Sequence, residues 1–136
     1  MRRVFVVTSY YLALLSPHDA LHAAAVEWSR NLRCRVVVTE FVLVELANAL
    51  SRAGTRQVFT GLLVILHADP LVKIVPLHRT LYQRGCELYT SRPDKDWSLT
   101  DCISFVVMKH EGINEALTAD RHFEQAGFKA LLKAEV

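Results

Sequence analysis

The hydrophobic positions of the chain alternate between short β-branched runs and longer stretches with helical spacing. Buried strands are predicted at 4–7, 35–38, 72–75 and 115–118, with a short fifth at 128–132. Helices are predicted at 10–15, 20–31, 40–53, 56–67, 79–90, 99–111 and 121–126. Runs such as V-F-V-V, apolar at every position, are typical of strands buried on both faces. The alternation therefore predicts an α/β domain, residues 1–136, in which helices cover both faces of a mainly parallel sheet of four to five strands.

Length and composition set few limits on function. The 136 residues fit one domain, and 16 Lys and Arg against 14 Asp and Glu give a net charge of +2, which permits a nucleic-acid partner without arguing for one. Cys34, Cys86 and Cys102 are an odd number without close spacing, which suits a reducing compartment better than a disulfide framework. No segment approaches the roughly 20 apolar residues of a membrane span. We therefore expect a cytoplasmic protein.

Polar residues follow two of the predicted strands at their carboxyl ends, where ligands of parallel sheets collect. Thr8 and Ser9 follow the first strand, and Thr118 and Asp120 end or follow the fourth. Each has a simple structural explanation, since Ser9 and Asp120 both stand where they would cap the next helix. These residues are therefore candidates for a site only in combination with others.

Further acids lie on two predicted helices. Glu45 stands in the otherwise apolar segment T-E-F-V-L-V-E-L-A-N-A-L and shares a helix face with Asn48, although a solvated outer position explains it equally well. Ser98 and Asp101 have the spacing of a capping box, and that alone accounts for Asp101. The neighbouring polar residues at this helix start are Asp94, Asp96 and Ser104.

The acids are more informative together than singly. Carboxylates near one rim repel each other unless a cation joins them, and oxygen ligands without Cys or His favour Mg²⁺ or Mn²⁺. The six histidines lack zinc-site spacing, so we expect His122 to be a surface or partner-bonded histidine. Phosphate-binding glycine motifs are absent from the sequence, which removes the main support for a nucleotide-triphosphate or dinucleotide site. The pattern favours metal-assisted phosphodiester hydrolysis.

The chain resembles PIN-domain proteins, in particular the VapC-type toxins of bacterial toxin–antitoxin pairs. The matching segments are V-F-V-V-T-S-Y-Y-L-A-L-L, T-E-F-V-L-V-E-L-A-N-A-L, D-W-S-L-T-D-C-I-S-F and L-T-A-D-R-H-F-E-Q-A-G-F, and they span nearly the whole chain. The resemblance implies a three-layer α/β/α PIN-like fold. It also implies an Mg²⁺- or Mn²⁺-dependent endoribonuclease that acts on structured RNA, forms a homodimer and is inhibited by a small antitoxin.

The same resemblance assigns residues. Of the four metal-binding acids of the family, three fall on Glu45, Asp101 and Asp120, whereas the first falls on Val7. The supporting positions are Thr8, Ser9, Asn48, Asp96, Ser98 and Ser104. Valine offers no ligand oxygen, so we hypothesise a ribonuclease that is weakened or inactivated at Val7.

Two other interpretations remain open. A PIN-fold protein could bind RNA or a protein partner without cutting, which Val7 favours. A flavodoxin-like domain for a small molecule would instead leave Glu45, Asp101 and Asp120 far apart. The candidate RNA contacts are Arg52, Arg56, Arg92 and Lys95, and the candidate dimer faces are the helices at 56–67 and 79–90, although the first of these helices could equally be core.

Overall fold

A five-stranded parallel sheet forms the centre of the protein. The computed structural model describes residues 1–132. Its strands are β1 (Arg3–Val6), β2 (Arg35–Thr39), β3 (Val72–Val75), β4 (Glu115–Leu117) and β5 (Lys129–Ala130). They lie in the order β3-β2-β1-β4-β5, and every neighbouring pair is parallel. The predicted mainly parallel sheet is confirmed, including its short last strand.

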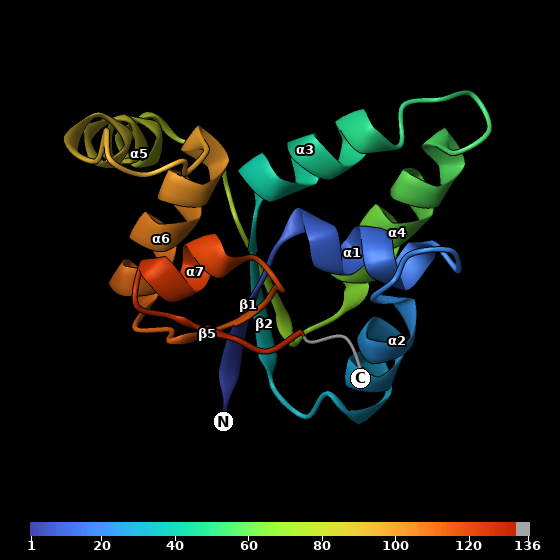
Figure 1. Ribbon diagram of the computed structural model, residues 1–136. Helices are drawn as coiled ribbons and strands as arrows, with labels where there is room; N and C mark the ends of the chain where they lie inside the picture. The colour runs from blue at the N-terminus through green and yellow to red at the C-terminus, as the bar shows by residue number, and fades with distance from the viewer. Residues whose placement is uncertain (133–136) are drawn as a thin grey trace.

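Seven helices connect the strands of the described chain. They are α1 (Thr8–Leu15), α2 (His22–Asn31), α3 (Glu40–Ala49), α4 (Arg56–Ala68), α5 (Arg79–Ser91), α6 (Leu99–Glu111) and α7 (Arg121–Gln125). In Figure 1, α1, α2 and α4 lie on one side of the sheet, and α6 and α7 lie on the other. The predicted three-layer α/β/α architecture is therefore confirmed. No helix of the described residues is long and apolar enough to cross a membrane.

The core is built on the central strands. Val4, Phe5 and Val6 of β1 are at most 1% exposed, as expected for a strand covered on both faces. Phe105 of α6 and Phe123 of α7 are also buried, and their rings meet edge to face with centroids 4.8 Å apart. Each such side chain contributes roughly 1.5–3 kcal/mol by burial. This packing fixes α6 and α7 against the sheet.

The order in which the chain adds strands to the sheet reverses between β1 and β4. From β1 it proceeds to β2 and β3, whereas β4 and β5 lie on the opposite side of β1. Val6 is level with Leu117 in the β1–β4 register, so Val7 and Thr118 leave the sheet side by side. Ligands of open parallel sheets bind at such a reversal, beyond the carboxyl ends of the strands. Residues 7–8 and 118–120 therefore lie where a ligand of this sheet is expected to bind.

The first helix begins earlier than predicted. β1 ends at Val6, and Val7 is the residue that precedes α1, with an extended backbone at φ −111° and ψ 167°. Its side chain makes no capping hydrogen bond. The expectation that Ser9 caps this helix is wrong, because Ser9 is already in the first turn and its side chain is exposed.

Two other helix ends differ from the prediction. The predicted helix 40–53 ends at Ala49, and side chains bond the carbonyl groups of the two residues that follow. The Thr55 hydroxyl donates to the Leu50 carbonyl at 3.0 Å, and Arg56 donates to the Ser51 carbonyl at 2.8 Å. The helix predicted at 20–31 begins at residue 22, after a turn in which the Asp19 carboxylate accepts from the backbone N–H of residue 21.

Candidate metal centre

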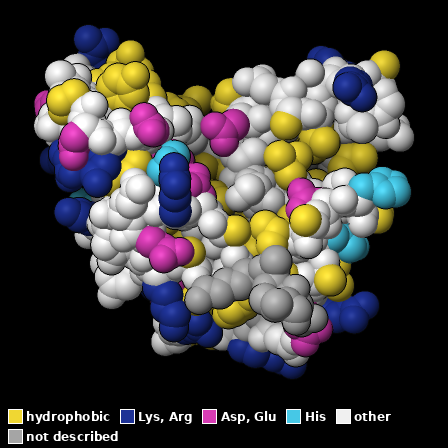
Figure 2. Space-filling model, in the orientation of Figure 1, with side chains coloured by type: hydrophobic (Ala, Val, Ile, Leu, Met, Phe, Trp, Pro, Cys, Tyr) yellow, Lys and Arg dark blue, Asp and Glu magenta, His cyan; other side chains and the backbone are white. Residues whose placement is uncertain are grey.

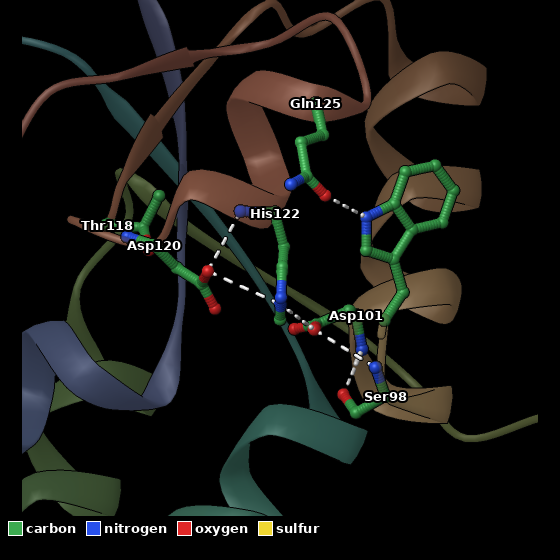
Figure 3. A network of polar contacts seen from close by, with 7 residues as sticks. Ser98, Asp101, Thr118, Asp120, His122 and Gln125 are labelled. Carbon is green, nitrogen blue, oxygen red and sulfur yellow. Dashed lines mark hydrogen bonds and ion pairs between the residues drawn. The ribbon is translucent and has the colours of Figure 1, made fainter. Parts of the chain in front are cut away.

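Two acids and one histidine meet at the carboxyl edge of the sheet. The Nδ1 atom of His122 lies 3.3 Å from Asp101 Oδ2 and 3.4 Å from Asp120 Oδ1. One ligand atom of each of the three side chains lies within 4.8 Å of the other two. Figure 3 shows the imidazole between the two carboxylates. The residues come from α6, from the loop after β4, and from α7.

The start of α6 holds Asp101 in place. The Asp101 N–H donates to the Ser98 hydroxyl at 3.0 Å, and the Ser98 N–H donates to Asp101 Oδ2 at 3.2 Å. The predicted capping box is thus confirmed. The same carboxylate benefits from the partial positive charge of the helix N-terminus. Capping does not exclude a metal role; it fixes the direction in which the Asp101 side chain projects.

Asp120 is oriented by two consecutive turns. Its N–H donates to the hydroxyl of buried Thr118 at 3.0 Å, and its Oδ1 accepts from the His122 N–H at 2.9 Å. The predicted role of Asp120 as the cap of the next helix is confirmed. The predicted strand included Thr118, but β4 ends one residue earlier, so Thr118 lies just beyond it.

A contact between α6 and α7 fixes the spacing of the two acids. The indole N–H of Trp97 donates to Gln125 Oε1 at 3.1 Å. The Trp97 ring is buried and meets Phe105 edge to face at 5.0 Å. The residue that precedes the α6 cap is therefore joined to the last residue of α7, so the two helix starts hold a constant separation.

The electrostatics of the two acids are unfavourable without a cation. Burial raises the pKa of the Asp101 carboxyl, hydrogen bonding to Ser98 and His122 opposes this, and the nearby charge of Asp120 raises the pKa further. Within residues 1–132, lysine and arginine form ion pairs with Glu111, Glu115 and Asp94, but none with Asp101 or Asp120. Two close carboxylates with no lysine or arginine partner are what a bound cation would stabilise.

Glu45 lies on the neighbouring wall and does not join this group. It is an exposed residue of α3, and its Oε1 accepts a short 2.5 Å hydrogen bond from the Thr8 hydroxyl. Thr8 is buried and follows the β1 edge, so it connects Glu45 to the same reversal point as Asp120. Of the three predicted acids, the structure thus brings two together and holds the third through Thr8.

Val7 is the position at which the family resemblance predicts a fourth acid. It is 8% exposed and lies level with Thr118 between the strand ends. Its side chain can neither bind a metal nor cap α1. Among the other supporting candidates, Asn48, Asp96 and Ser98 are exposed, Ser9 is exposed in α1, and Ser104 is buried in α6.

His122 is the part of the cluster that the sequence did not identify as a ligand candidate. The expectation of a partner-bonded histidine is confirmed, but its partners are the two candidate metal-binding acids. A signal was available in the sequence, because a residue two positions after a helix-capping aspartate lies in the first turn beside that cap. Spacing between histidines, the criterion used for zinc, could not reveal a single histidine that joins two acids.

An open groove of about 990 Å³ begins beside the capping box. Its lining includes Tyr89, Arg92, Lys95, Trp97 and Ser98. The Arg92 guanidinium lies over the Trp97 ring, 5.1 Å from its centroid, and pairs with Asp94. The groove is therefore continuous with the Asp101 helix start through Ser98.

The wall of this groove depends on a close approach of α5 to α6. A Cβ atom at Gly85 would lie 2.3 Å from the Ile103 side chain, a distance that only glycine avoids. Of the predicted RNA contacts, Arg92 and Lys95 line the groove. Arg52 and Arg56 are exposed beyond the end of α3, where Arg56 bonds the Ser51 carbonyl.

Comparison with known proteins agrees with this fold. Residues 4–129 match the PIN domain family model. The 23S rRNA-specific endonuclease VapC20 of Mycobacterium tuberculosis is 29% identical over 126 residues, which cover 92% of this chain and 95% of that protein. The crystal structure of VapC20, described as a sarcin-ricin loop cleaving toxin, superposes with a TM-score of 0.85 at 26% identity and covers 94% of this chain and 98% of that one.

Two more distant structures share the fold alone. FitAcB of Neisseria gonorrhoeae has a TM-score of 0.66 at 16% identity, over 96% of this chain and 97% of that one. VapBC2 of Rickettsia felis, bound to a DNA fragment from their promoter, has a TM-score of 0.66 at 14% identity, over 95% and 97%. The chain resembles VapC-type toxins over nearly its whole length, and it belongs to the PIN-domain family.

Proposed function

We propose that this protein is a divalent-metal-dependent endoribonuclease of toxin type, formed by residues 1–136 as one domain and weakened by Val7. The observation that carries the proposal is the close approach of Asp101 and Asp120 at the strand reversal, without a lysine or arginine between them in the described residues. A PIN-family chain that resembles an rRNA endonuclease supports the reaction class.

The residues present fit a hydrated divalent ion. Mg²⁺ and Mn²⁺ accept one or two protein carboxylates and keep several waters, which matches the two gathered acids. When bound, such an ion would activate water and neutralise charge on the phosphate oxygens. Burial and the charge of Asp120 raise the pKa of Asp101, and a bound cation would favour the ionised form of this carboxylate.

The chain's own residues provide orientation. Ser98 and Thr118 fix Asp101 and Asp120 through backbone turns, so little rearrangement is needed to present both carboxylates together. Thr8 holds Glu45 on the β1 side of the same edge, where we propose that Glu45 contacts the ion through its water shell. The missing acid at Val7 leaves the strand side of this shell without a protein oxygen, which reduces affinity and rate.

The groove beside Asp101 is the proposed RNA path. Half-exposed Tyr89 provides a surface on which a base can stack, and Lys95 provides a charge for a phosphate. Arg92 contributes less charge, because Asp94 holds it in a two-bond pair. An unpaired strand lying in this groove would reach the acids past Ser98.

Substrate and partners follow from the resemblance to VapC-type toxins. We propose structured RNA as the substrate, a small antitoxin as the inhibitor, a homodimer as the active form and the cytoplasm as the location. Exposed apolar residues on the candidate dimer helices support an interface, with Val64 and Ile65 of α4 at 68% and 64% exposure. Tyr82 on α5 is similarly exposed, at 50%.

Replacement of Val7 by aspartate tests the enzymatic proposal. We expect Val7→Asp to cleave a structured RNA in Mn²⁺ at a rate above that of the Val7 protein, and EDTA to abolish the gain. Val7→Asn is the matched control, because asparagine can cap α1 as aspartate does but lacks the carboxylate. Equal activity of the Val7, Val7→Asp and Val7→Asn proteins would overturn the proposal.

A second function is a PIN-fold module that binds RNA or a protein without cleaving it. The buried, apolar Val7 at the strand reversal favours this alternative. Calorimetry of the unaltered chain with Mn²⁺ separates the two, because a module without a usable metal site gives no binding isotherm. A measurable isotherm that Asp101→Asn removes would favour the nuclease.

A further inference from the structure

We propose that His122 is a nitrogen ligand of this metal centre and that it makes the site select a first-row transition ion such as Mn²⁺ over Mg²⁺. The inference rests on the proposed function in one respect, namely that Asp101 and Asp120 bind a divalent ion. It goes beyond that function because it assigns a third protein ligand and the class of the metal.

The imidazole nitrogen lies between the two acids and is not bonded closely to either one. A charge-assisted N–H···O contact is typically about 2.7–2.9 Å long, whereas an N–H shared between two acceptors makes longer contacts. His122 Nδ1 instead lies 3.3 Å from Asp101 and 3.4 Å from Asp120. Adjacent ligands of an octahedral ion with bonds of about 2.1 Å stand about 3.0 Å apart. The nitrogen is therefore within a few tenths of an ångström of the ligand spacing to each acid.

The backbone imposes this position on the imidazole. His122 is the second residue of α7, and its N–H is already bonded to Asp120. Phe123 is buried beside it, and Gln125 at the end of the same short helix bonds Trp97. The histidine side chain is 20% exposed and lies between the acids (Figure 3). Its placement is therefore part of the packed structure and not a chance contact of a free surface side chain.

Ligand chemistry connects this position to metal choice. Sites made only of carboxylate and water suit Mg²⁺ and Mn²⁺ alike, whereas an imidazole nitrogen suits transition ions and not Mg²⁺. Val7 supplies no ligand atom where the family resemblance predicts an acid, and His122 Nδ1 is the nitrogen that lies between the two remaining acids. A site with this nitrogen as its third protein ligand should prefer Mn²⁺ to Mg²⁺.

Spectroscopy of Mn²⁺ bound to the unaltered chain provides the direct test. We expect electron spin-echo modulation from a directly coordinated ¹⁴N nucleus, and we expect His122→Gln to abolish it. We also expect His122→Gln to weaken Mn²⁺ binding by about 10–100-fold, the range for losses at metal sites, with a much smaller change for Mg²⁺. His110→Gln is the matched control, because His110 is an exposed residue at the far end of α6.

The outcomes separate this inference from the proposed function. Mn²⁺ binding that requires Asp120 but shows no ¹⁴N modulation would overturn the role of His122 and leave the nuclease proposal standing. Absence of any Mn²⁺ binding would overturn both. Since the modulation is measured on the unaltered chain, poor folding of His122→Gln would not prevent a decision.

Discussion

Acidic residues lie at both the amino edge of the sheet, where the strands begin, and the carboxyl edge, where they end, but their ion pairs differ. At the amino edge, Glu111 contacts Arg3 and Lys73, each at 2.5 Å, and Glu115 pairs with Arg2 through two hydrogen bonds of 2.7 and 2.8 Å. At the carboxyl edge, neither Asp101 nor Asp120 has a lysine or arginine ion pair within residues 1–132. In Figure 2, acidic side chains flank the notch at the upper edge, and lysine and arginine side chains lie along the lower edge and also elsewhere on this face, including below the notch.

The pKa shifts of the acids also differ between the two edges. Hydrogen bonding to Lys73 and Arg3 lowers the pKa of Glu111, and Arg2 lowers that of Glu115. Burial, with the charge of Asp120, raises that of Asp101. A carboxylate whose pKa is lowered is already satisfied by the protein. A carboxylate whose pKa is raised by burial and a second acid is less well stabilised by its surroundings, and such perturbed groups in a cleft are candidates for function.

Helix α6 contains both situations in one element. Asp101 in its first turn is favoured by the helix dipole, whereas Glu111 in its last residue is disfavoured and requires its basic partners. Arg3 also donates to the Glu111 carbonyl at 2.7 Å, which satisfies the helix end. The acid that the dipole disfavours is therefore the paired one, and the acid that the dipole favours is left for a ligand.

The largest effect on the rate of RNA cleavage should come from replacing an acid of the carboxyl edge by its amide, compared with the same replacement at the amino edge. In a Val7→Asp background with RNA-cleaving activity, we expect Asp120→Asn to reduce the Mn²⁺-dependent rate at least about 100-fold, since loss of outer partners alone costs 10–100-fold at metal sites. Glu115→Gln at the amino edge should leave the rate within about twofold. Single-turnover cleavage of one RNA measures both. Equal losses at the two edges would refute the distinction between them.

A smaller effect is expected on the free energy of unfolding when a substitution adds an acid at the carboxyl edge. In EDTA, we expect Val7→Asp to unfold more easily by about 1–3 kcal/mol, because a buried carboxylate joins two others, with about 1 kcal/mol recovered by capping α1. Saturating Mn²⁺ at 100 times Kd should add about 2.7 kcal/mol. Urea unfolding with and without Mn²⁺ measures this.

Val7→Asn is the control for the stability experiment. It should gain the cap without the repulsion, so at a fixed Mn²⁺ concentration its stability should rise as much as that of the Val7 protein and less than that of Val7→Asp. If Val7→Asp were more stable than the Val7 protein in EDTA, the carboxyl edge would not be short of a cation.

The sequence predicted those parts of the site in which a residue contacts near neighbours along the chain. Asp101 and Asp120 lie in local caps, so the capping-box spacing of Ser98 and Asp101 and the position of Asp120 before the next helix predicted their capping contacts correctly. The sheet order placed both at one rim. Val7 was identified through the family resemblance, and the structure adds that it precedes α1 between the strand ends.

The parts that sequence did not predict depend on side-chain geometry across elements. The hydrogen bond between Thr8 and Glu45 joins residues 37 positions apart, and nothing in the local pattern of either indicates it. His122 was judged by spacing to other histidines, although its partner Asp101 is 21 positions away. The end of α3 was placed four residues late, because helix propensity continues past Ala49 and does not reveal the turn in which Thr55 and Arg56 bond the Leu50 and Ser51 carbonyl groups.

The pH dependence of stability should differ in sign between the edges. Glu111 has a lowered folded pKa, so its contribution is present above the ordinary glutamate value near ~4.3 and is lost as the pH falls through the folded pKa. Asp101 has a raised folded pKa, so in EDTA it destabilises the protein as the pH rises through that pKa.

Two amide variants test this sign difference. We expect Glu111→Gln to cost about 1 kcal/mol at pH 7 after allowance for solvent screening, and little below pH ~3. Asp101→Asn keeps an oxygen for the capping box and should raise stability at pH 7 in EDTA by less than about 1 kcal/mol. Urea unfolding between pH 3 and pH 7 would contradict the comparison if both variants shifted stability in the same direction.

The smallest effect should be on RNA affinity, when one lysine is removed at each edge. Lys95 lines the groove beside Asp101, whereas Lys73 belongs to the amino edge and is bonded to Glu111. We expect Lys95→Gln to weaken binding of a single-stranded RNA about threefold and to reduce the salt slope of log K by about 1, as for the loss of one phosphate contact. Lys73→Gln should leave the slope unchanged. Fluorescence anisotropy between 50 and 200 mM salt, in EDTA to prevent cleavage, measures both variants. If Lys73→Gln reduced the slope and Lys95→Gln did not, the RNA would bind at the amino edge, and the groove beside the acids would not be its path.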